Sequence, residues 1–349
     1  MRPTSCLRNS MANLFMPRYS RGRRPAALLA LLLATLFAGG FAAFAAPLKI
    51  ALISSGSFTD GGWNQAGKQA MLKLKKDLHA HISTVDHVSP VRAVDVMRDY
   101  VSQGYNLVIG HGYEFLVPAR ETAGMSKHTH FAVCGADVAA PGIATLDFEL
   151  SGASYQLGVL AALKSKTGKL GFIGGEAIPS VTACYRGFVA GARSINPHVK
   201  VAQAYTSWDQ PALSKSQAEA FIQQGIDVIY QNVDAASPGV FEAVAAANRA
   251  GHQVWVFGCN SDQNHNPAAS RYTLASAVIR LDRAFEALAK SIQHHTFAAG
   301  VHREGLANNV CVVMVHRKLI GTVITPAMLK AVQQAGTQLR TGKITISPK

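Results

Sequence analysis

From Lys49 onward, the chain alternates short apolar runs rich in β-branched residues with longer amphipathic segments, and this alternation constrains the fold most strongly. The short runs predict strands at Lys49–Ser54, Ile82–His87, Leu107–Gly110, His130–Cys134, Lys169–Ile173, Val199–Ala204, Val228–Gln231 and Gln253–Phe257. The longer segments predict helices at Asn64–Asp77, Pro90–Gln103, Gly152–Lys164, Val181–Ile195, Pro211–Gln224, Pro238–Ala250 and Ala277–His294. Near-continuous apolar strands separated by helices are what a parallel sheet covered on both faces requires. The sequence therefore predicts an α/β protein.

The order of strands and helices runs through the chain twice, which predicts two doubly wound parallel-sheet lobes. After Gln263 the pattern changes to one long helix, the apolar strand Asn309–Val315 and a helical tail from Pro326 to Thr341. A late helix and strand cannot complete a third lobe, so we expect them to return to the first. The predicted division is 46–148 plus 264–325 for the first lobe, 149–263 for the second, and 326–349 packing across a multi-strand hinge.

The first 45 residues predict a cleavable signal peptide rather than part of the folded protein. Six arginines and no acidic residue precede the apolar run from Ala26 to Ala46, which ends in the small-residue pattern Ala43-Phe44-Ala45. A basic start, an apolar middle and small residues before the cleavage point are typical of a secretory leader. No Cys follows the run, so the protein is not expected to be a lipoprotein. A retained membrane anchor is the alternative, because the run is just long enough to span a bilayer.

Charge and cysteine content exclude several classes of protein. The chain has a net charge of +14, but without the arginines of the leader it has 28 basic and 20 acidic residues. These basic residues are scattered through helical segments, so no nucleic-acid groove is predicted. Outside the leader, Cys134, Cys184, Cys259 and Cys311 lack the close spacing of zinc or redox motifs. Buried free thiols are expected, and their pairing is left open.

Two loops of the first lobe combine glycines with polar and aromatic residues directly after a strand. The loop after the first strand carries Asp60, Trp63 and Asn64, and the loop after the third carries Tyr113 and Phe115. Because ligands bind outside the carboxyl ends of parallel strands, we expect these five residues to line a cleft. The alternative is local: Asp60 caps the following helix, Trp63 packs in the core, and the third loop is a simple turn.

In the second lobe, three loops after strands carry side chains that can meet sugar hydroxyls or base edges. They are Trp208, Asn232, Asp234, Asn260 and Asp262. Carboxylates and amides at such positions accept and donate hydrogen bonds to a polar ligand. Asp234 and Asp262 can equally cap the helices that follow them, and the pattern by itself does not separate binding from capping.

Enzyme signatures are absent from the sequence. It contains no Gly-x-Ser-x-Gly elbow and no His-Glu-x-x-His pair, and its Gly174-Gly175 turn lacks the lysine of a phosphate-binding loop. The histidines are scattered, so no metal ion and no cofactor are predicted. We therefore expect a binding protein rather than an enzyme.

In their order along the chain, the loop motifs resemble the basic membrane protein family of substrate-binding components. The matching motifs are Asp60-Gly61-Gly62-Trp63-Asn64-Gln65, Gly110-His111-Gly112-Tyr113-Glu114-Phe115, Ser154-Tyr155-Gln156-Leu157-Gly158-Val159-Leu160-Ala161-Ala162, Gly174-Gly175 with Pro179, Gly187-Phe188, Ser207-Trp208-Asp209-Gln210-Pro211-Ala212, Gly258-Cys259-Asn260-Ser261-Asp262-Gln263 and Thr341-Gly342-Lys343-Ile344-Thr345-Ile346. No single motif is specific, whereas the ordered set covers nearly the whole chain after the leader.

The resemblance implies a type I periplasmic binding fold and a receptor for a purine or nucleoside. It implies that Trp63 and Asn64 contact the base, with Phe115 or Trp208 as a second stacking face, and that Asp262 and Asp234 meet hydroxyl groups. The partners implied are the permease and ATPase of an ABC importer, served by a monomeric periplasmic protein.

The chain departs from the family pattern at two positions. Asn260 stands where the family often has Asp, and Ile279 stands where a lysine is common. These departures weaken the case for a nucleoside and leave the two-lobed fold untouched. A receptor for a sugar or other small polar metabolite, a sensor that passes its closed state to a signalling partner, and a periplasmic enzyme are the alternatives.

Overall fold

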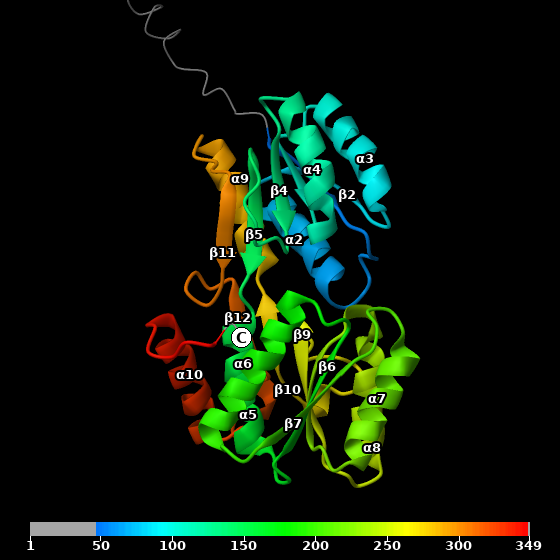
Figure 1. Ribbon diagram of the computed structural model, residues 1–349, viewed down its shortest axis with the longest axis vertical. Coiled ribbons are helices and arrows are strands. Elements are labelled where there is room, and N and C mark those ends of the chain that lie inside the picture. The colour runs from blue at the N-terminus through cyan, green and yellow to red at the C-terminus, as the bar shows by residue number, and fades with distance from the viewer. Residues whose placement is uncertain (1–46, 348–349) are drawn as a thin grey trace, which may run out of the picture. The chain divides into compact units, whose positions relative to one another are not determined.

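The computed structural model describes residues 47–347, so the predicted signal peptide lies outside the described residues. The described chain forms two six-stranded sheets, each covered by helices (Figure 1). This is the predicted pair of doubly wound α/β lobes. In the described part of the chain, no helix combines the length and apolar character needed to cross a membrane.

The sheet of the first lobe has the order β11-β5-β4-β3-β1-β2, and all of its neighbouring strands are parallel. Its strands are β1 (Lys49–Ile53), β2 (His81–Val85), β3 (Leu107–Gly110), β4 (His130–Cys134), β5 (Ile143–Phe148) and β11 (Gly300–Glu304). Its helices are α2 (Trp63–Asp77), α3 (Pro90–Ser102), α4 (Leu116–Thr122) and α9 (Leu281–Gln293), with η1 (Tyr113–Phe115) and η2 (Ala123–Met125) beside α4.

Strand β1 shows why both faces of this sheet must be covered. Ile50 and Leu52 belong to one buried cluster, with residues of α2 and α9, whereas Ala51 and Ile53 belong to another, with residues of α3 and α4. Successive side chains of a strand point to opposite faces, so a wholly apolar strand needs a helical layer on each side. The pairs α2 with α9 and α3 with α4 provide those layers.

The sheet of the second lobe has the order β12-β10-β9-β8-β6-β7, with only β12 antiparallel to its neighbour. Its strands are β6 (Lys169–Gly174), β7 (Lys200–Tyr205), β8 (Val228–Asn232), β9 (Trp255–Asn260), β10 (Thr273–Ile279) and β12 (Cys311–Val315). Its helices are α5 (Ser151–Lys164), α6 (Pro179–Ile195), α7 (Pro211–Gln223), α8 (Ser237–Arg249) and α10 (Pro326–Arg340), with η3 (Asp234–Ala236), η4 (Ser270–Tyr272) and η5 (Arg317–Leu319).

Glycines set the close packing of α5 against α6. A Cβ atom at Gly158 would lie 2.0 Å from the carbonyl oxygen of Phe188, and one at Gly191 would lie 1.9 Å from that of Tyr155. The two helix backbones therefore touch at positions that only glycine can occupy. This pair anchors one face of the second sheet, and α10 packs against α5.

The chain passes between the two sheets three times, between β5 and α5, between β10 and α9, and between β11 and β12. The crossing segments are joined by backbone hydrogen bonds, from Glu149 to Glu304 (2.8 Å) and from Arg280 to Val310 (2.7 Å). They form the multi-strand hinge that the sequence predicts.

The predicted lobe boundaries are wrong for two strands and for the tail. Residues 264–325 were expected in the first lobe, but β10 and β12 pair within the second sheet, and only α9 and β11 return to the first. The helix expected at Ala277–His294 begins at Leu281, because Thr273–Ile279 forms β10. The tail expected across the hinge packs on α5. Apolar periodicity identifies a buried strand without showing which sheet it joins.

The four cysteines of the described chain are buried and free. Cys184 of α6 and Cys259 of β9 lie together beneath the loops at the carboxyl edge of the second sheet, close to the hydroxyl group of Tyr230. The expectation of buried thiols is confirmed.

Candidate functional site

Asp60 organises the loop between β1 and α2. Its carboxylate accepts hydrogen bonds from the backbone N–H groups of Gly62, Asn64 and Gln65, each at 2.9 Å. It also accepts one from the side-chain amide of Asn64 at 2.8 Å, while Ser54 donates to the amide oxygen of Asn64. Asp60 therefore caps α2, and both ends of the Asn64 amide are already bonded. The contacts of Asp60 and Asn64 in the structure are therefore those of the capping alternative.

Trp63, the first residue of α2, is half-buried and lies flat against His111. The two rings are 4.1 Å apart with an angle of 8° between their planes, and Phe148 meets the indole edge-on at 5.6 Å. The indole N–H donates to the carbonyl oxygen of His111 (3.4 Å), and Nε2 of His111 bonds the carbonyl oxygen of Trp63 (2.9 Å). Burial lowers the pKa of His111 to about 4, so the stacked imidazole is neutral near pH 7.

The two aromatic residues predicted in the loop after β3 differ in their exposure to solvent. Tyr113 is exposed over 58% of its surface and is available to a ligand or a partner. Phe115 is fully buried in the core of the first lobe, where its side chain fills the space beside Gly110. The prediction of Phe115 as a stacking face is therefore wrong, because no part of its ring reaches the surface.

In the second lobe, Asn232, Asp234 and Asn260 form one hydrogen-bonded group at the ends of β8 and β9. The side-chain amide of Asn260 donates to Asp234 at 2.8 Å and to Asn232 at 3.3 Å. Asp234 and Asn260 have backbone φ angles of 43° and 62°. Residues other than glycine adopt this region at a cost, and such strain concentrates at functional sites. Burial, followed by repulsion from Asp60, raises the pKa of Asp234 to about 6.

The loops of the two lobes meet through three hydrogen bonds. The backbone N–H of Trp63 donates to the Oδ1 atom of Asp234 (3.1 Å). The carbonyl oxygen of Gly61 accepts from the Ser261 hydroxyl (2.8 Å) and from the Gln263 side-chain amide (3.1 Å). We call these five residues the closure contact. Sequence reasoning missed Ser261 and Gln263, although both follow Asn260 in the same polar loop.

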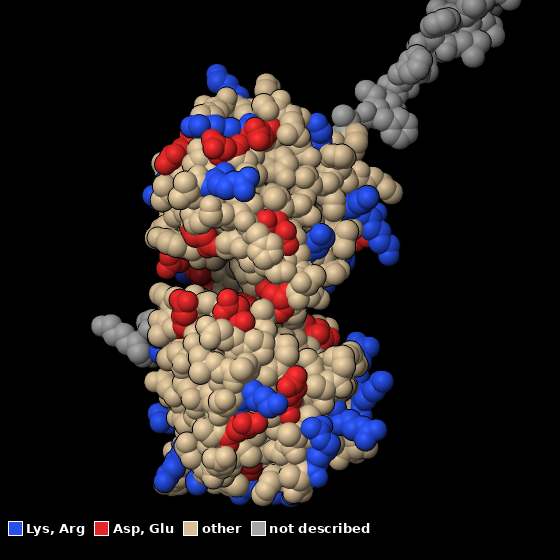
Figure 2. Space-filling view, turned by 90° about the vertical axis from the view of Figure 1, so that its right-hand side faces the viewer, with Lys and Arg blue, Asp and Glu red and all other residues tan. Residues whose placement is uncertain are grey.

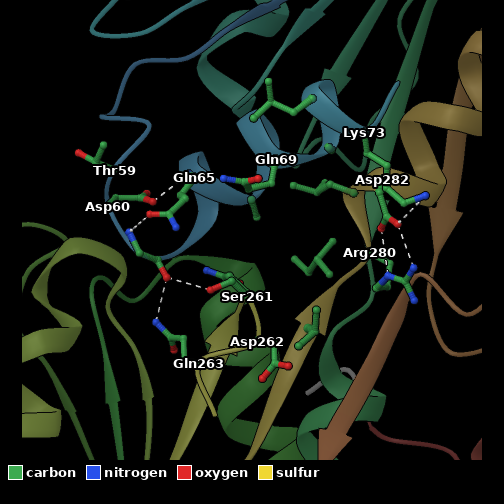
Figure 3. A pocket seen from close by; sticks show the side chains of 18 of the residues that line it. Thr59, Asp60, Gln65, Gln69, Lys73, Ser261, Asp262, Gln263, Arg280 and Asp282 are labelled. Carbon is green, nitrogen blue, oxygen red and sulfur yellow. Dashed lines mark hydrogen bonds and ion pairs between the residues drawn. The ribbon is translucent and has the colours of Figure 1, made fainter. Parts of the chain in front are cut away.

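A cavity of about 910 Å³ lies beside the closure contact, between α2, the loop after β9 and the hinge (Figure 3). Three predicted site residues line it: Asp60, Asn260 and Asp262. Trp63, Asn64, Tyr113, Trp208, Asn232 and Asp234 are not among its lining residues. Trp208 instead covers Gly175, where a Cβ atom would lie 2.3 Å from the indole ring. The two tryptophans therefore do not share this cavity.

The wall of the cavity nearest the hinge carries charged side chains that the sequence analysis did not single out. Arg280 donates two hydrogen bonds to Asp282, at 3.0 and 2.9 Å, and Lys73 of α2 lies 3.9 Å from the same carboxylate. Gln65, Gln69 and Lys73 are four residues apart and point along one side of α2 into the cavity (Figure 3). That polar stripe was the signal available in the sequence.

Carboxylates follow the strands on both sides of the space between the lobes. Figure 2 shows the surface hollowed between the lobes, with Asp and Glu side chains gathered on either side. Each of the eight loops after β1–β4 and β6–β9 carries one acidic residue, and no Lys or Arg lies within four residues of any of them: Asp60, Asp86, Glu114, Asp137, Glu176, Asp209, Asp234 and Asp262. An acidic lining disfavours anionic ligands and favours neutral or cationic ones.

A comparison with known families gives a match over residues 48–332 to the model described as ABC transporter substrate-binding protein PnrA-like. The chain belongs to this family. The resemblance to basic membrane proteins is thereby confirmed. The family consists of extracytoplasmic substrate-binding proteins and not of enzymes, so the expectation of a binding protein is also confirmed.

Two curated relatives of the PnrA-like family are similar along most of this chain. The ABC transporter nucleoside-binding protein BmpA of Lactococcus lactis subsp. cremoris is 26% identical over 86% of this chain and 90% of its own length. Basic membrane protein D of Borreliella burgdorferi is 26% identical over 69% of this chain and 70% of its own length.

Solved structures confirm the type I binding-protein fold of this family member. An ABC transporter solute-binding protein from Aeropyrum pernix K1 has a TM-score of 0.76 at 19% identity, covering 87% of this chain and 94% of that protein. The glucose-galactose binding protein GanP of Geobacillus stearothermophilus has a TM-score of 0.57 at 14% identity, covering 78% and 99%. At these identities the likeness concerns the fold alone.

Proposed function

We propose that this protein is the binding component of an ABC importer that captures a purine or nucleoside between its two lobes. The observation that carries the proposal is the closure contact, in which loops from both sheets meet beside a cavity shared by the lobes and the hinge. A ligand that touches both lobes favours the arrangement in which they are together, so binding and closure are coupled.

The chemistry of the loops supports an uncharged, hydroxyl-bearing heterocycle. Asp262 is exposed at the cavity and has an oxygen free to accept from a hydroxyl group, and Asn260 adds an amide. Trp63 and Tyr113 lie at the ends of β1 and β3 outside the cavity lining, so they offer aromatic surface only to a ligand that extends beyond the cavity. The loops after the strands are acidic and disfavour a phosphate group there, but Lys73, Lys76 and Arg280 also line the cavity, so nucleotides are tested beside nucleosides.

The remaining proposals concern partners and location. A membrane permease would receive the ligand, and its ATPase would supply the energy for transport, as the name of the family implies. The leader in residues 1–45 would direct the chain to the periplasm and be removed there, leaving a monomer without a lipid anchor.

A sugar or another small polar metabolite is the second candidate ligand. The same fold in a glucose-galactose binding protein and the hydroxyl-accepting carboxylates both favour it. The departures from the family pattern at Asn260 and Ile279 also favour this candidate. At these positions the chain lacks the acidic residue and the lysine that family members often have.

Calorimetry on residues 47–349 tests the proposal. One base stack and two hydrogen bonds to charged groups total roughly 4–9 kcal/mol before ordering costs, which predicts Kd values between about 1 mM and about 1 μM for adenosine or guanosine. The corresponding 5′-monophosphates, free bases, ribose, glucose and galactose complete the panel. Heat from the sugars alone supports the second candidate, and no heat from any nucleoside or base overturns the first.

A matched pair of variants locates the ligand. Asp262→Asn removes a carboxylate that lines the cavity, whereas Glu242→Gln removes an exposed carboxylate of α8, in the same lobe, that lies neither in the cavity lining nor in the acidic loops. We expect the first variant to weaken nucleoside binding and the second to leave it unchanged. Equal affinities for both variants would place the ligand elsewhere.

A further inference from the structure

Asp234 belongs to the second lobe but contacts the start of a helix in the first. Its Oδ1 atom accepts the backbone N–H of Trp63, the first residue of the 15-residue helix α2. The approach is close enough that a Cβ atom at Gly62 would lie 2.3 Å from the same oxygen. The carboxylate of one lobe thus occupies the N-terminal end of a helix of the other, where backbone N–H groups favour an acceptor.

This end of α2 already has a carboxylate of its own lobe. Asp60 accepts four hydrogen bonds within the loop that leads into α2, and these contacts do not depend on the second lobe. Asp234 reaches the same place only when the lobes come together. Closure therefore brings two carboxylates toward one helix end and leaves Asp234 only partly exposed to water, and both changes disfavour its ionised form.

We propose that closure of the two lobes is coupled to the uptake of a proton by Asp234, so that the ligand-free protein closes more readily in mild acid than at neutral pH. The protonated carboxyl keeps a carbonyl oxygen that accepts from Trp63 and from the Asn260 amide. The hydrogen bonds of the closure contact therefore survive protonation, while the repulsion from Asp60 is removed.

The titration of Asp234 supports this direction. In the closed arrangement, burial raises the pKa of Asp234 most and repulsion from Asp60 raises it further, to about 6. The hydrogen bonds from Asn260 and Trp63 act in the opposite direction. In the open form, a solvated aspartate has a pKa of about 3.9. A group whose pKa is higher in one state stabilises that state at low pH, and the benefit is lost as the pH rises through the higher pKa.

The other titratable groups around Asp234 do not change charge in the relevant range. Burial raises the pKa of the Cys259 thiol well above its usual value, so it remains neutral. His111, behind Trp63, has a pKa of about 4 and is neutral above pH 5. Among the described residues around Asp234, Asp60 is thus the charged group that repels its carboxylate. Two pKa values near 6 and 3.9 predict a rise of about tenfold in the closed-to-open ratio between pH 7.5 and pH 5.

Single-molecule energy transfer on the ligand-free protein tests the proposal without relying on any nucleoside. Dyes are attached at Glu121→Cys in the first lobe and Glu219→Cys in the second, both at exposed positions, while the native cysteines are buried. The closed population is measured from pH 7.5 to pH 5.0. We expect the closed-to-open ratio of the protein with native Asp234 to rise about tenfold.

Three variants separate the proton effect from a general effect on closure. Asp234→Asn, which mimics the protonated side chain, should close at pH 7.5 as the native protein does at pH 5 and lose its pH dependence. Ser261→Ala should lower the closed population at every pH and keep the dependence, because its hydrogen bond does not titrate. Glu242→Gln, an exposed carboxylate of α8 paired with Lys215, should behave as the native protein.

Two results would overturn the proposal: a closed population that does not change with pH, or a dependence that persists in Asp234→Asn. If Asp234→Asn does not fold, Gly62→Ala replaces it, since the added methyl keeps Asp234 away from α2. A pH dependence that survives in Gly62→Ala likewise refutes the role of Asp234.

Discussion

Gly62→Ala is the most direct perturbation of closure that the structure offers. A Cβ atom there would lie 2.3 Å from the Asp234 carboxylate and 3.0 Å from its Cα atom, so the carboxylate must rotate away from α2 and the two backbones must separate by about 0.5 Å, given ordinary contact distances of about 3.5 Å. The hydrogen bond from Trp63 to Asp234 is then lost, and the bonds from Ser261 and Gln263 to Gly61 are weakened.

The expected loss follows from those three bonds. The lost bond to the carboxylate is worth about 1.5–3 kcal/mol, and the two weakened neutral bonds give up part of about 0.5–1.5 kcal/mol each, so closure loses at least about 2 kcal/mol. Since every 1.4 kcal/mol is tenfold, ligand affinity should fall by about thirtyfold or more. Calorimetry with the best ligand of the panel measures the affinity, and energy transfer between the two lobes measures closure.

Gly104→Ala is the control for backbone strain away from the closure contact. Gly104, between α3 and β3, has a φ of 70°, and no atom lies within 4 Å of a Cβ built there, so this change strains a loop of the first lobe without touching the second. It should cost about 1–2 kcal/mol of stability and leave closure largely intact. If Gly62→Ala closes and binds as the native protein does, or if the two variants behave alike, the closure contact is not what joins ligand binding to lobe closure.

Three further predictions concern single side chains. The pKa of His111 is lowered to about 4 by burial, so a native-state stabilisation of about 3 kcal/mol, complete above pH 6.5, should be lost as the pH falls toward 4; urea unfolding of the native protein and of His111→Gln measures the difference. Gly191→Ala should destabilise the second lobe by more than about 2 kcal/mol, because its methyl would meet the carbonyl oxygen of Tyr155 at 1.9 Å, and unchanged thermal melting would contradict this. Trp63→Ala should lower the melting temperature, because it removes the ring stacked on His111, whereas Gln69→Ala, which removes an exposed side chain at the cavity, should weaken ligand binding and leave the melting temperature unchanged.

The strands and helices of the fold could be read from the sequence where the apolar pattern is strong. In the run at Lys49–Ser54, the four residues from Ile50 to Ile53 are all apolar, and they lie in β1, which is covered on both faces. Strand β5 was missed, because Ile143–Phe148 ends in Asp147 and Phe148 and leads directly into the hinge. Strand β11, with His302, Arg303 and Glu304, carries no apolar run at all. Edge strands supported by backbone pairing leave little trace in side-chain hydrophobicity.

The candidate site was predictable in outline and not in detail. The rule that ligands lie at the carboxyl ends of parallel strands led to the loops that carry Asp60, Asp234 and Asn260, and these loops do converge. The same rule could not distinguish Tyr113, which is exposed, from Phe115, which fills the core two residues later. That difference depends on the turn of η1 and on the space beside Gly110.

By itself, the sequence determined the class of fold, the two-lobed plan and the polar loops that follow the strands, because hydrophobic periodicity and turn residues act locally along the chain. Only the tertiary structure decided that β10 and β12 complete the second sheet, and that the carboxylate of Asp234 meets the first turn of α2. Both depend on contacts between residues far apart in the chain, 171 positions in the case of Trp63 and Asp234. Such contacts are set by how the layers pack, and packing is a property of the whole core rather than of any segment.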